Sequence, residues 1–173
     1  MNEQELLDYC KKHYLYIPES GEFWHRTSEN RMKLIATRKG EDYMCIMIVD
    51  NGKKHKHYAH KLIWLMMTGH LPECQIDHIN NIHDDNRYCN LREATHQQNI
   101  FNRGIFKNNT TGYKGVIAIN NRFRATIGFN NKRIHLGYYD TLEEAAAAYE
   151  EKARELFGEY YREIVNTSQA SSS

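Results

Sequence analysis

The sequence predicts an α+β protein built from two consecutive units, and three observations lead to this prediction. Apolar residues recur at helical spacing in some segments and alternate in others, so helices and short strands are both expected. The length of 173 residues allows one modest core or two small ones. The formal net charge of +1 hides a division: residues 94–139 carry seven cations and no carboxylate, whereas residues 140–173 are acidic.

The first unit begins with a short amphipathic helix over residues 2–13. Three strand-like runs bounded by turn-prone residues come next: Glu22–Arg26, Met32–Ala36 and Tyr43–Val49. The apolar stretch His60–Thr68 predicts a buried helix that ends at Gly69. A polar segment then predicts a strand, a loop, a second strand and a helix capped by Thr95, over Gln75–Ile79, Arg87–Leu91 and His96–Arg103.

The second unit follows a segment of linker composition at residues 104–111. We therefore expect one domain over residues 1–103, another over 112–160, and a tail over 161–173 that is disordered at its end. Asn pairs separate three predicted strands, Tyr113–Ile119, Arg122–Phe129 and Lys132–Tyr138. A helix is then predicted to start at Thr141, with Glu144 completing a capping box, and to stop at Gly158.

Strand alternation sorts the side chains of this small sheet onto two faces. One face is apolar, matches the apolar side of the helix, and carries Val116, Ala118, Phe123, Ala125, Ile127, Ile134 and Leu136. The other face is basic and carries Lys114, Ile117, Ile119, Arg122, Arg124, Thr126, Arg133 and His135. A three-stranded ribbon with arginines on one face is suited to the major groove of duplex DNA.

This half of the chain resembles the plant ethylene-response, or APETALA-type, DNA-binding domain. The resemblance is carried by YKGV at Tyr113–Val116, RFRATI at Arg122–Ile127, HLGYYDT at His135–Thr141, and the EEAAAAYEEKARELFG that follows. It implies that the sheet docks in the major groove, with contacts from Lys114, Arg122, Thr126, Arg133 and His135; the basic face adds Arg124. Ile117, Ile119 and His135 replace the Arg, Arg and Trp usual in plant proteins, so no base preference is implied.

The polar segment holds the residue types that phosphodiester hydrolysis requires. A base must deprotonate water, and a neutral His suits this role once an acceptor fixes its tautomer. A cation must offset charge on the phosphorane and the leaving oxygen, and carboxylate and amide oxygens hold hard divalent cations. The residues that bring these types together are Asp77 and His78, followed by Asn90 and Asn99.

The same segment resembles the HNH nucleases with their ββα-metal site, and more closely the phage homing-endonuclease branch. D-H at 77–78, N-R-x-x-N-L at 86–91 and T-H-x-x-N at 95–99 carry the match, which covers roughly residues 43–103. The resemblance implies that His78 is the general base, that Asn90 orients it, and that Asp77 and Asn99 bind metal. His96 is an alternative or additional ligand, and Mg²⁺, or else Mn²⁺, is favoured over tightly held Zn²⁺.

Other features narrow the class and leave alternatives open. No run is long and apolar enough for a membrane span, the N-terminus is not a secretory signal, and the four Cys form no C-x-x-C pair. A cytoplasmic setting is therefore expected. The resemblance to phage homing endonucleases implies a bacterial host and a phage or mobile-element origin. A zinc site at His55, His57 and His60 is a minor alternative to an exposed basic strand.

Taken together, these patterns predict a metal-dependent endonuclease that nicks double-stranded DNA and uses no small-molecule substrate. The first unit cuts and the second grips the major groove. Two alternatives remain: a non-catalytic, sequence-specific DNA-binding regulator on a degenerate nuclease scaffold, and a nuclease directed at RNA. The regulator predicts binding without cutting in Mg²⁺, whereas the RNA-directed nuclease predicts exposed aromatic residues on the binding face.

Overall fold

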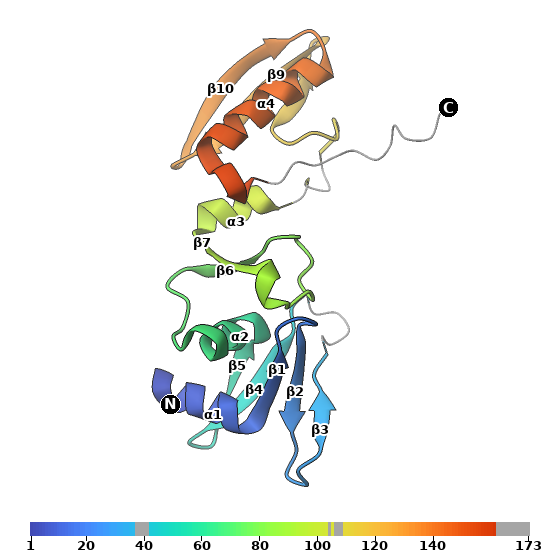
Figure 1. Cartoon of the computed structure of the whole chain (residues 1–173). Helices are drawn as coiled ribbons and strands as arrows, with labels where there is room; N and C mark the ends of the chain where they lie inside the picture. Colours follow the sequence, from blue (N-terminus) through green and yellow to red (C-terminus); the bar gives the residue numbers. More distant parts are fainter. Residues whose placement is uncertain (37–41, 104, 106–108, 162–173) are drawn as a thin grey trace, which may run out of the picture. The chain divides into compact units, whose positions relative to one another are not determined.

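The computed structural model describes residues 1–36, 42–103, 105 and 109–161, and its contacts divide the chain into two compact units. The first comprises Met1–Thr95 and the second His96–Ser173. Each combines helices with small antiparallel sheets, as the α+β prediction states (Figure 1). No helix among the described residues is both long enough and apolar enough to cross a bilayer.

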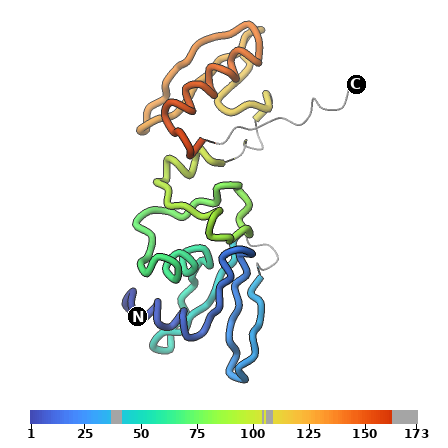
Figure 2. Tube along the Cα trace, in the orientation of Figure 1, coloured from blue at the N-terminus to red at the C-terminus, as the bar shows by residue number. Residues whose placement is uncertain are grey.

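The first unit is a succession of short elements, which Figure 2 traces in order. Their bounds are α1 Glu3–His13, β1 Tyr14–Ile17, β2 Glu22–Arg26, β3 Met32–Leu34, β4 Cys45–Asp50, β5 Lys53–Tyr58, α2 Ala59–Thr68, β6 Gln75–His78, a 3₁₀ turn Tyr88–Asn90, and β7 Leu91–Ala94. β1, β2 and β3 form one antiparallel sheet, while β4–β5 and β6–β7 are separate hairpins. The predicted turn at Lys39-Gly40 lies outside the described residues.

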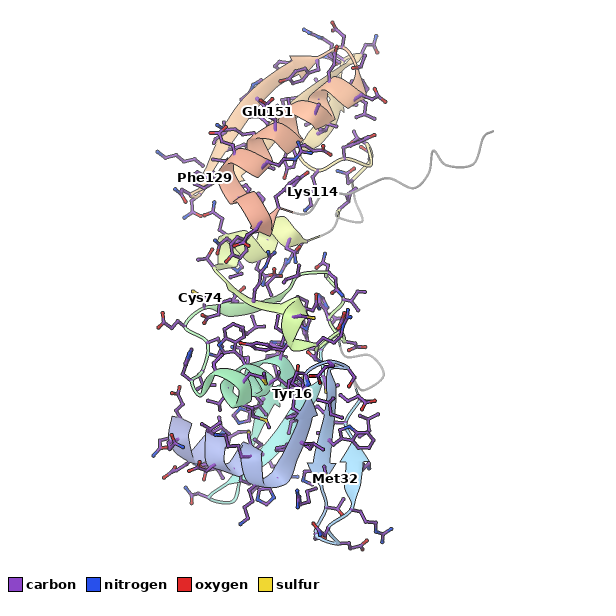
Figure 3. The ribbon with its side chains drawn as sticks, viewed as in Figure 1. Tyr16, Met32, Cys74, Lys114, Phe129 and Glu151 are labelled. Carbon is purple, nitrogen blue, oxygen red and sulfur yellow. The ribbon has the colours of Figure 1, made fainter. Side chains whose placement is uncertain are left out.

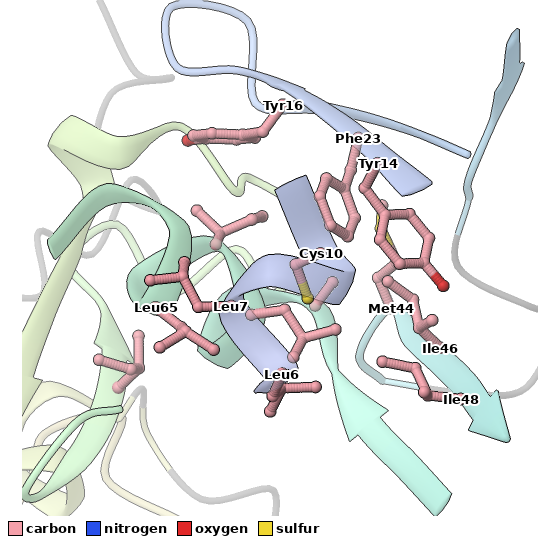
Figure 4. Close-up of a cluster of buried hydrophobic side chains, with 14 of the residues drawn as sticks. Leu6, Leu7, Cys10, Tyr14, Tyr16, Phe23, Met44, Ile46, Ile48 and Leu65 are labelled. Atoms are coloured by element: carbon pink, nitrogen blue, oxygen red, sulfur yellow. The ribbon is translucent and has the colours of Figure 1, made fainter. Parts of the chain in front are cut away.

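The core of this unit forms where α1, α2 and the strands meet (Figure 4). Leu6, Leu7 and Cys10 supply the buried side of α1, as the helical spacing predicts. The helix starts at a capping box in which the Asn2 side chain accepts from the Glu5 amide and the Glu5 carboxylate accepts from the Asn2 amide. Burial of this apolar side, rather than intrinsic propensity, holds so short a helix in place.

The second unit packs one long helix across a three-stranded sheet (Figure 1). Its elements are α3 His96–Asn102, β8 Val116–Ile119, β9 Arg122–Phe129, β10 Lys132–Tyr139, α4 Leu142–Phe157 and a 3₁₀ turn Gly158–Tyr160. Both hairpin turns place two Asn residues at positive φ, Asn120-Asn121 and Asn130-Asn131, as predicted. The capping box of Thr141 with Glu144 and the helix stop at Gly158 are confirmed.

The division between the units differs from the predicted linker at residues 104–111. α3 belongs to the second unit, because the Phe101 ring stacks on Phe157 of α4 with centroids 3.5 Å apart. Phe101 is only 8% exposed and joins the same buried cluster as Ile127 and Tyr149. The predicted linker itself lies partly outside the described residues, as does most of the predicted tail.

A β-bulge in β10 changes which side chains face outward. Thr126 pairs with His135, but the next residue of β9 in register, Ala125, pairs with Gly137. Gly137 adopts φ 146°, which disfavours a side chain at this position. Beyond the bulge, Tyr138 lies opposite Arg124 and is exposed. Strict alternation from His135 would instead turn Tyr138 toward the face that the helix covers.

Candidate active site

The β6–β7 hairpin places Asp77 and His78 side by side at the end of β6. Both are 3% exposed, and they pair across the hairpin with Arg92 and Leu91 respectively. Successive side chains on a strand point to opposite faces, so the carboxylate and the imidazole approach their surroundings from different sides. Burying a carboxylate and an imidazole next to each other requires polar partners, and the hairpin loop and β7 provide them.

His78 is held by Asn86 and not by the predicted Asn90. The Nε2 of His78 lies 3.1 Å from the Oδ1 of Asn86, which is 1% exposed. An Asn oxygen can only accept, so Nε2 carries the proton and Nδ1 carries the lone pair. Burial lowers the pKa of His78, and the hydrogen bond that His78 donates to Asn86 opposes this only in part. A neutral imidazole at neutral pH is the form that a general base requires.

Asn90 instead braces the loop that joins β6 to β7. Its Oδ1 accepts from the amide of Asn80 at 2.9 Å, and its Nδ2 donates to the Asp85 carbonyl at 2.7 Å. The prediction that Asn90 lies on a strand over Arg87–Leu91 is wrong, because Tyr88–Asn90 forms a 3₁₀ turn and β7 begins at Leu91. Asn90 can therefore act on His78 only through the loop.

A second brace fixes the same loop next to Asn86. The Arg87 guanidinium donates to both oxygens of Asp85, at 2.7 Å and 2.6 Å, and Asn80 donates to the same carboxylate. These hydrogen bonds, with Arg87 the largest cause, lower the pKa of Asp85 to about 2. Asp85 and Arg87 flank Asn86 in the sequence, so their ion pair holds the backbone on both sides of Asn86 before any substrate arrives, which is what a pre-organised site needs.

Asp77 forms an ion pair with Arg92 directly across the hairpin. Nε and Nη2 of Arg92 lie 3.0 Å and 2.9 Å from the same oxygen, Oδ2. The Arg92 side chain is 15% exposed, so this pair is shielded from solvent far more than a surface ion pair. The sequence did not mark Arg92 as a partner of Asp77, because the second strand was predicted to end at Leu91.

Aromatic rings from α2 and the loop surround His78. His60 is buried and edge-on to His78, with ring centroids 5.3 Å apart, and burial lowers its pKa to about 3. His83 stacks on Tyr43 at 4.2 Å, and its centroid lies 6.0 Å from that of His78. These rings exclude water from one side of the imidazole and keep its charged form unfavourable.

In the second unit, the outer face of the sheet carries most of the predicted DNA-contacting residues. Arg122, Arg133 and His135 are exposed, while Arg124 and Thr126 are half-buried. Arg122 pairs with Asp140, but this pair is solvent-exposed and of the kind that contributes little energy. The Nε of Arg124 is buried without a hydrogen-bond partner among the described residues, and an unsatisfied donor of this kind favours an incoming acceptor.

Lys114 differs from the other predicted contacts. Its Nζ donates to the Phe101 carbonyl at 2.7 Å and lies 6.0 Å from the Tyr161 ring centre, beside α4 (Figure 3). Lys114 therefore ties α3 to the sheet within the second unit. Sequence reasoning missed Tyr138, which the bulge brings onto the outer face with its ring 4.9 Å from His135.

Comparison with known proteins supports a nuclease. Residues 57–100 match the family model described as HNH endonuclease. Over this segment the chain is similar to HNH endonucleases. The chain is 36% identical over 108 residues to a protein named as an uncharacterized HNH endonuclease of Acanthamoeba polyphaga mimivirus, a match that covers 61% of the chain. The chain is also 43% identical over 72 residues to an ethylene-responsive transcription factor of Arabidopsis thaliana, a match that covers 39% of the chain.

These matches cover only part of the relatives. The chain spans 56% of the viral protein and 16% of the plant protein. No solved structure matches the chain at a significant level.

The segment that matches the HNH family model offers donors that fit a hard divalent cation. HNH nucleases generally use such an ion, and Mg²⁺ is commonly held by one or two carboxylates, with water and substrate phosphate completing its shell. Asp77 supplies one buried carboxylate. Among the described residues no three His, Cys, Asp or Glu side chains gather to hold a metal, so the zinc alternative at His55, His57 and His60 gains no support.

The predicted second ligands lie on α3. His96 is exposed and Asn99 is half-buried, and both belong to the second unit, whereas Asp77 belongs to the first. Their pairing with Asp77 at one metal therefore stays a prediction. Asn86, which accepts from His78, was not among the predicted site residues, although it stands first in the N-R-x-x-N-L motif that carries the HNH resemblance.

Proposed function

We propose that the chain is a metal-dependent endonuclease that nicks duplex DNA. The observation that carries this proposal is the buried pair Asp77–His78, with His78 fixed by Asn86, inside the segment that matches the HNH endonuclease family. Nicking is proposed because one catalytic pair per chain can break one strand per event. The viral relative supports a phage or mobile-element origin, with action on DNA inside a host cell.

His78 acts as the general base in this proposal. Its Nδ1 takes a proton from the attacking water, while Nε2–H keeps its bond to Asn86 and holds the ring in one orientation. Asp77 would hold the metal, with Asn99 as the second ligand and His96 as the alternative. A bound Mg²⁺ or Mn²⁺ would supply Lewis-acid stabilisation of the developing charge on the phosphate and the leaving 3′ oxygen.

The second unit binds the DNA. Five residues of the outer sheet face are proposed as its contacts: Arg122, Arg124, Thr126, Arg133 and His135. The sheet is about as wide as a major groove, and α4 covers its other face. The similarity to a plant ethylene-responsive transcription factor supports this part of the proposal without assigning a target sequence.

A second candidate function is binding without cutting. The observation that favours it is the ion pair of Arg92 with Oδ2 of Asp77, because a guanidinium already occupies an oxygen that a metal would use. A DNA-binding regulator on a nuclease scaffold would keep such a pair permanently.

Plasmid nicking separates the two candidates. Supercoiled plasmid is incubated with the full chain in Mg²⁺, in Mn²⁺ and in excess EDTA, and open-circle product is measured over time. The proposal expects nicking in either metal and a loss of at least about 10²-fold in EDTA, the scale of one catalytic contribution. Equal rates with and without EDTA contradict the metal role, and binding of plasmid without any nicking supports the regulator.

A further inference from the structure

The β4–β5 hairpin of the first unit presents a second basic surface. Its register places Lys56 opposite Met47 and Lys54 opposite Val49. Residues directly opposite each other on paired strands share a face. All four side chains are exposed, so this face of the hairpin is open to solvent.

The other face of the hairpin is anchored. Ile46 and Ile48 alternate with the exposed residues of β4 and are buried in the core of the first unit, at 6% and 0% exposure (Figure 4). The turn Asn51-Gly52 has both residues at positive φ, which matches the twist of a tight two-residue hairpin. The surface is therefore a rigid ribbon rather than a mobile loop.

The charge of the ribbon is one-sided. β5 begins with the run Lys53–His57, which contains three Lys, two His and no carboxylate. The one acidic residue of the hairpin, Asp50, is paired with the N-terminal ammonium of Met1. An edge strand is protected against strand addition by a lysine or two, so this longer run of basic residues indicates a polyanionic partner.

The ribbon continues directly into the framework around His78. β5 ends at Tyr58 and α2 begins at the next residue. The Tyr58 ring stacks on His60 at 5.5 Å and 6°, and His60 in turn contacts His78 edge-on. A polyanion bound on the ribbon is thereby held by the same packed elements that hold the proposed base.

We propose that Lys54 and Lys56 on the exposed face of β4–β5 bind the phosphate backbone of duplex DNA beside the phosphate to be cut. This inference rests on the proposed nuclease function and adds a DNA contact in the first unit. DNA is the favoured occupant because the ribbon leads to the HNH domain, whose proposed substrate is itself a polyanion. At about 3.3 Å per residue, a six-residue strand spans about 20 Å, enough to meet more than one phosphate.

The test compares two double variants of the full chain by fluorescence anisotropy on a 30-base-pair duplex in EDTA, at several salt concentrations. Lys54→Gln with Lys56→Gln removes the proposed contacts. Lys11→Gln with Lys33→Gln removes two other exposed lysines of the same unit and serves as the control. Each phosphate contact contributes about 0.9 to the slope of log K against log salt, so the first variant should flatten the slope by about 1.8 and the control should leave it unchanged.

A third variant, Lys54→Arg with Lys56→Arg, retains the charge and should restore the wild-type slope. An unchanged slope for the Gln variant overturns the inference, as does an equal loss in the control. Self-association of the Gln variant with an unchanged slope also overturns the inference. That result would instead show that the two lysines prevent edge-to-edge association of the hairpin. Because binding is measured without metal, a chain that binds but never nicks refutes the nuclease proposal alone, whereas absence of binding overturns both.

Discussion

The hairpin β6–β7 and the sheet β8–β10 are both short antiparallel structures, yet their polar residues are placed in opposite ways. In the hairpin, Asp77, His78 and Asn86 are buried and each has a side-chain partner. On the sheet, Arg122, Arg133 and His135 are exposed, and the ion pair of Arg122 is solvated. Buried, mutually bonded groups are pre-organised for chemistry, whereas exposed cations are available to phosphates, so the two regions suit cutting and binding respectively.

The largest expected effect concerns which region α3 belongs to. Phe101→Ala should lower the unfolding free energy of the second unit by about 3–5 kcal/mol, because it removes a buried ring stacked on Phe157. Hydrogen exchange by mass spectrometry should show lost protection in β9 and α4 and little change in β4. Ile100→Ala, at an exposed position of the same helix, is the control. Lost protection in the first unit alone would contradict the assignment.

The next effect separates two asparagines of the hairpin. Asn86→Ala should slow nicking by about 10²-fold without weakening DNA binding, because Nε2 of His78 loses its acceptor. Asn86→Asp retains an acceptor oxygen and should recover part of the rate.

Asn90→Ala should instead destabilise the first unit by about 1–3 kcal/mol, since it leaves the Asn80 amide and the Asp85 carbonyl without their partner. Single-turnover nicking and thermal unfolding measure the two quantities, and identical behaviour of the two variants would refute the distinction.

Near neutral pH, the smallest of these effects is the pH dependence of stability. Burial lowers the pKa of His60 to about 3, below its ordinary 6.5, so at pH values between these the unfolded chain binds a proton that the folded chain does not. His60 should therefore cost no stability above pH 6.5 and should destabilise the first unit as pH falls from 6.5 to about 3, by at most about 1.4 kcal/mol per pH unit. His60→Phe should flatten this dependence in urea titrations, while the exposed His70→Gln should not. A dependence that survives in His60→Phe would assign it to other groups.

Local chemistry made most of the fold predictable. The Asn pairs at the hairpin turns and the Thr141–Glu144 capping box act within a few residues, and both formed as expected. The burial pattern of α1 also followed from its helical spacing. The HNH resemblance located the hairpin, because the residues that carry the resemblance lie within the segment 57–100 that matches the family model.

Long-range contacts account for what the sequence did not reveal. Strict alternation does not anticipate the bulge at Gly137, which brings Tyr138 onto the outer face of the sheet. Asn86, and not the predicted Asn90, holds His78, and this difference depends on the 3₁₀ turn Tyr88–Asn90. The spacing of the motif residues does not specify the geometry of that turn. α3 belongs to the second unit because Phe101 stacks on Phe157, more than fifty residues later in the sequence. The bond from Lys114 to the Phe101 carbonyl is likewise a contact between residues distant in the sequence.

The most direct test of the division between cutting and binding compares His78→Ala with the double variant Arg122→Ala and Arg133→Ala. Each is measured for duplex affinity over a range of salt and for the nicking rate at saturating protein. His78→Ala should slow nicking by about 10²–10⁴-fold and leave affinity unchanged. The arginine variant should flatten the salt slope by about one unit per lost phosphate contact and keep the rate at saturation. If both variants change the same quantity, chemistry and binding do not reside in separate regions, and the account is contradicted.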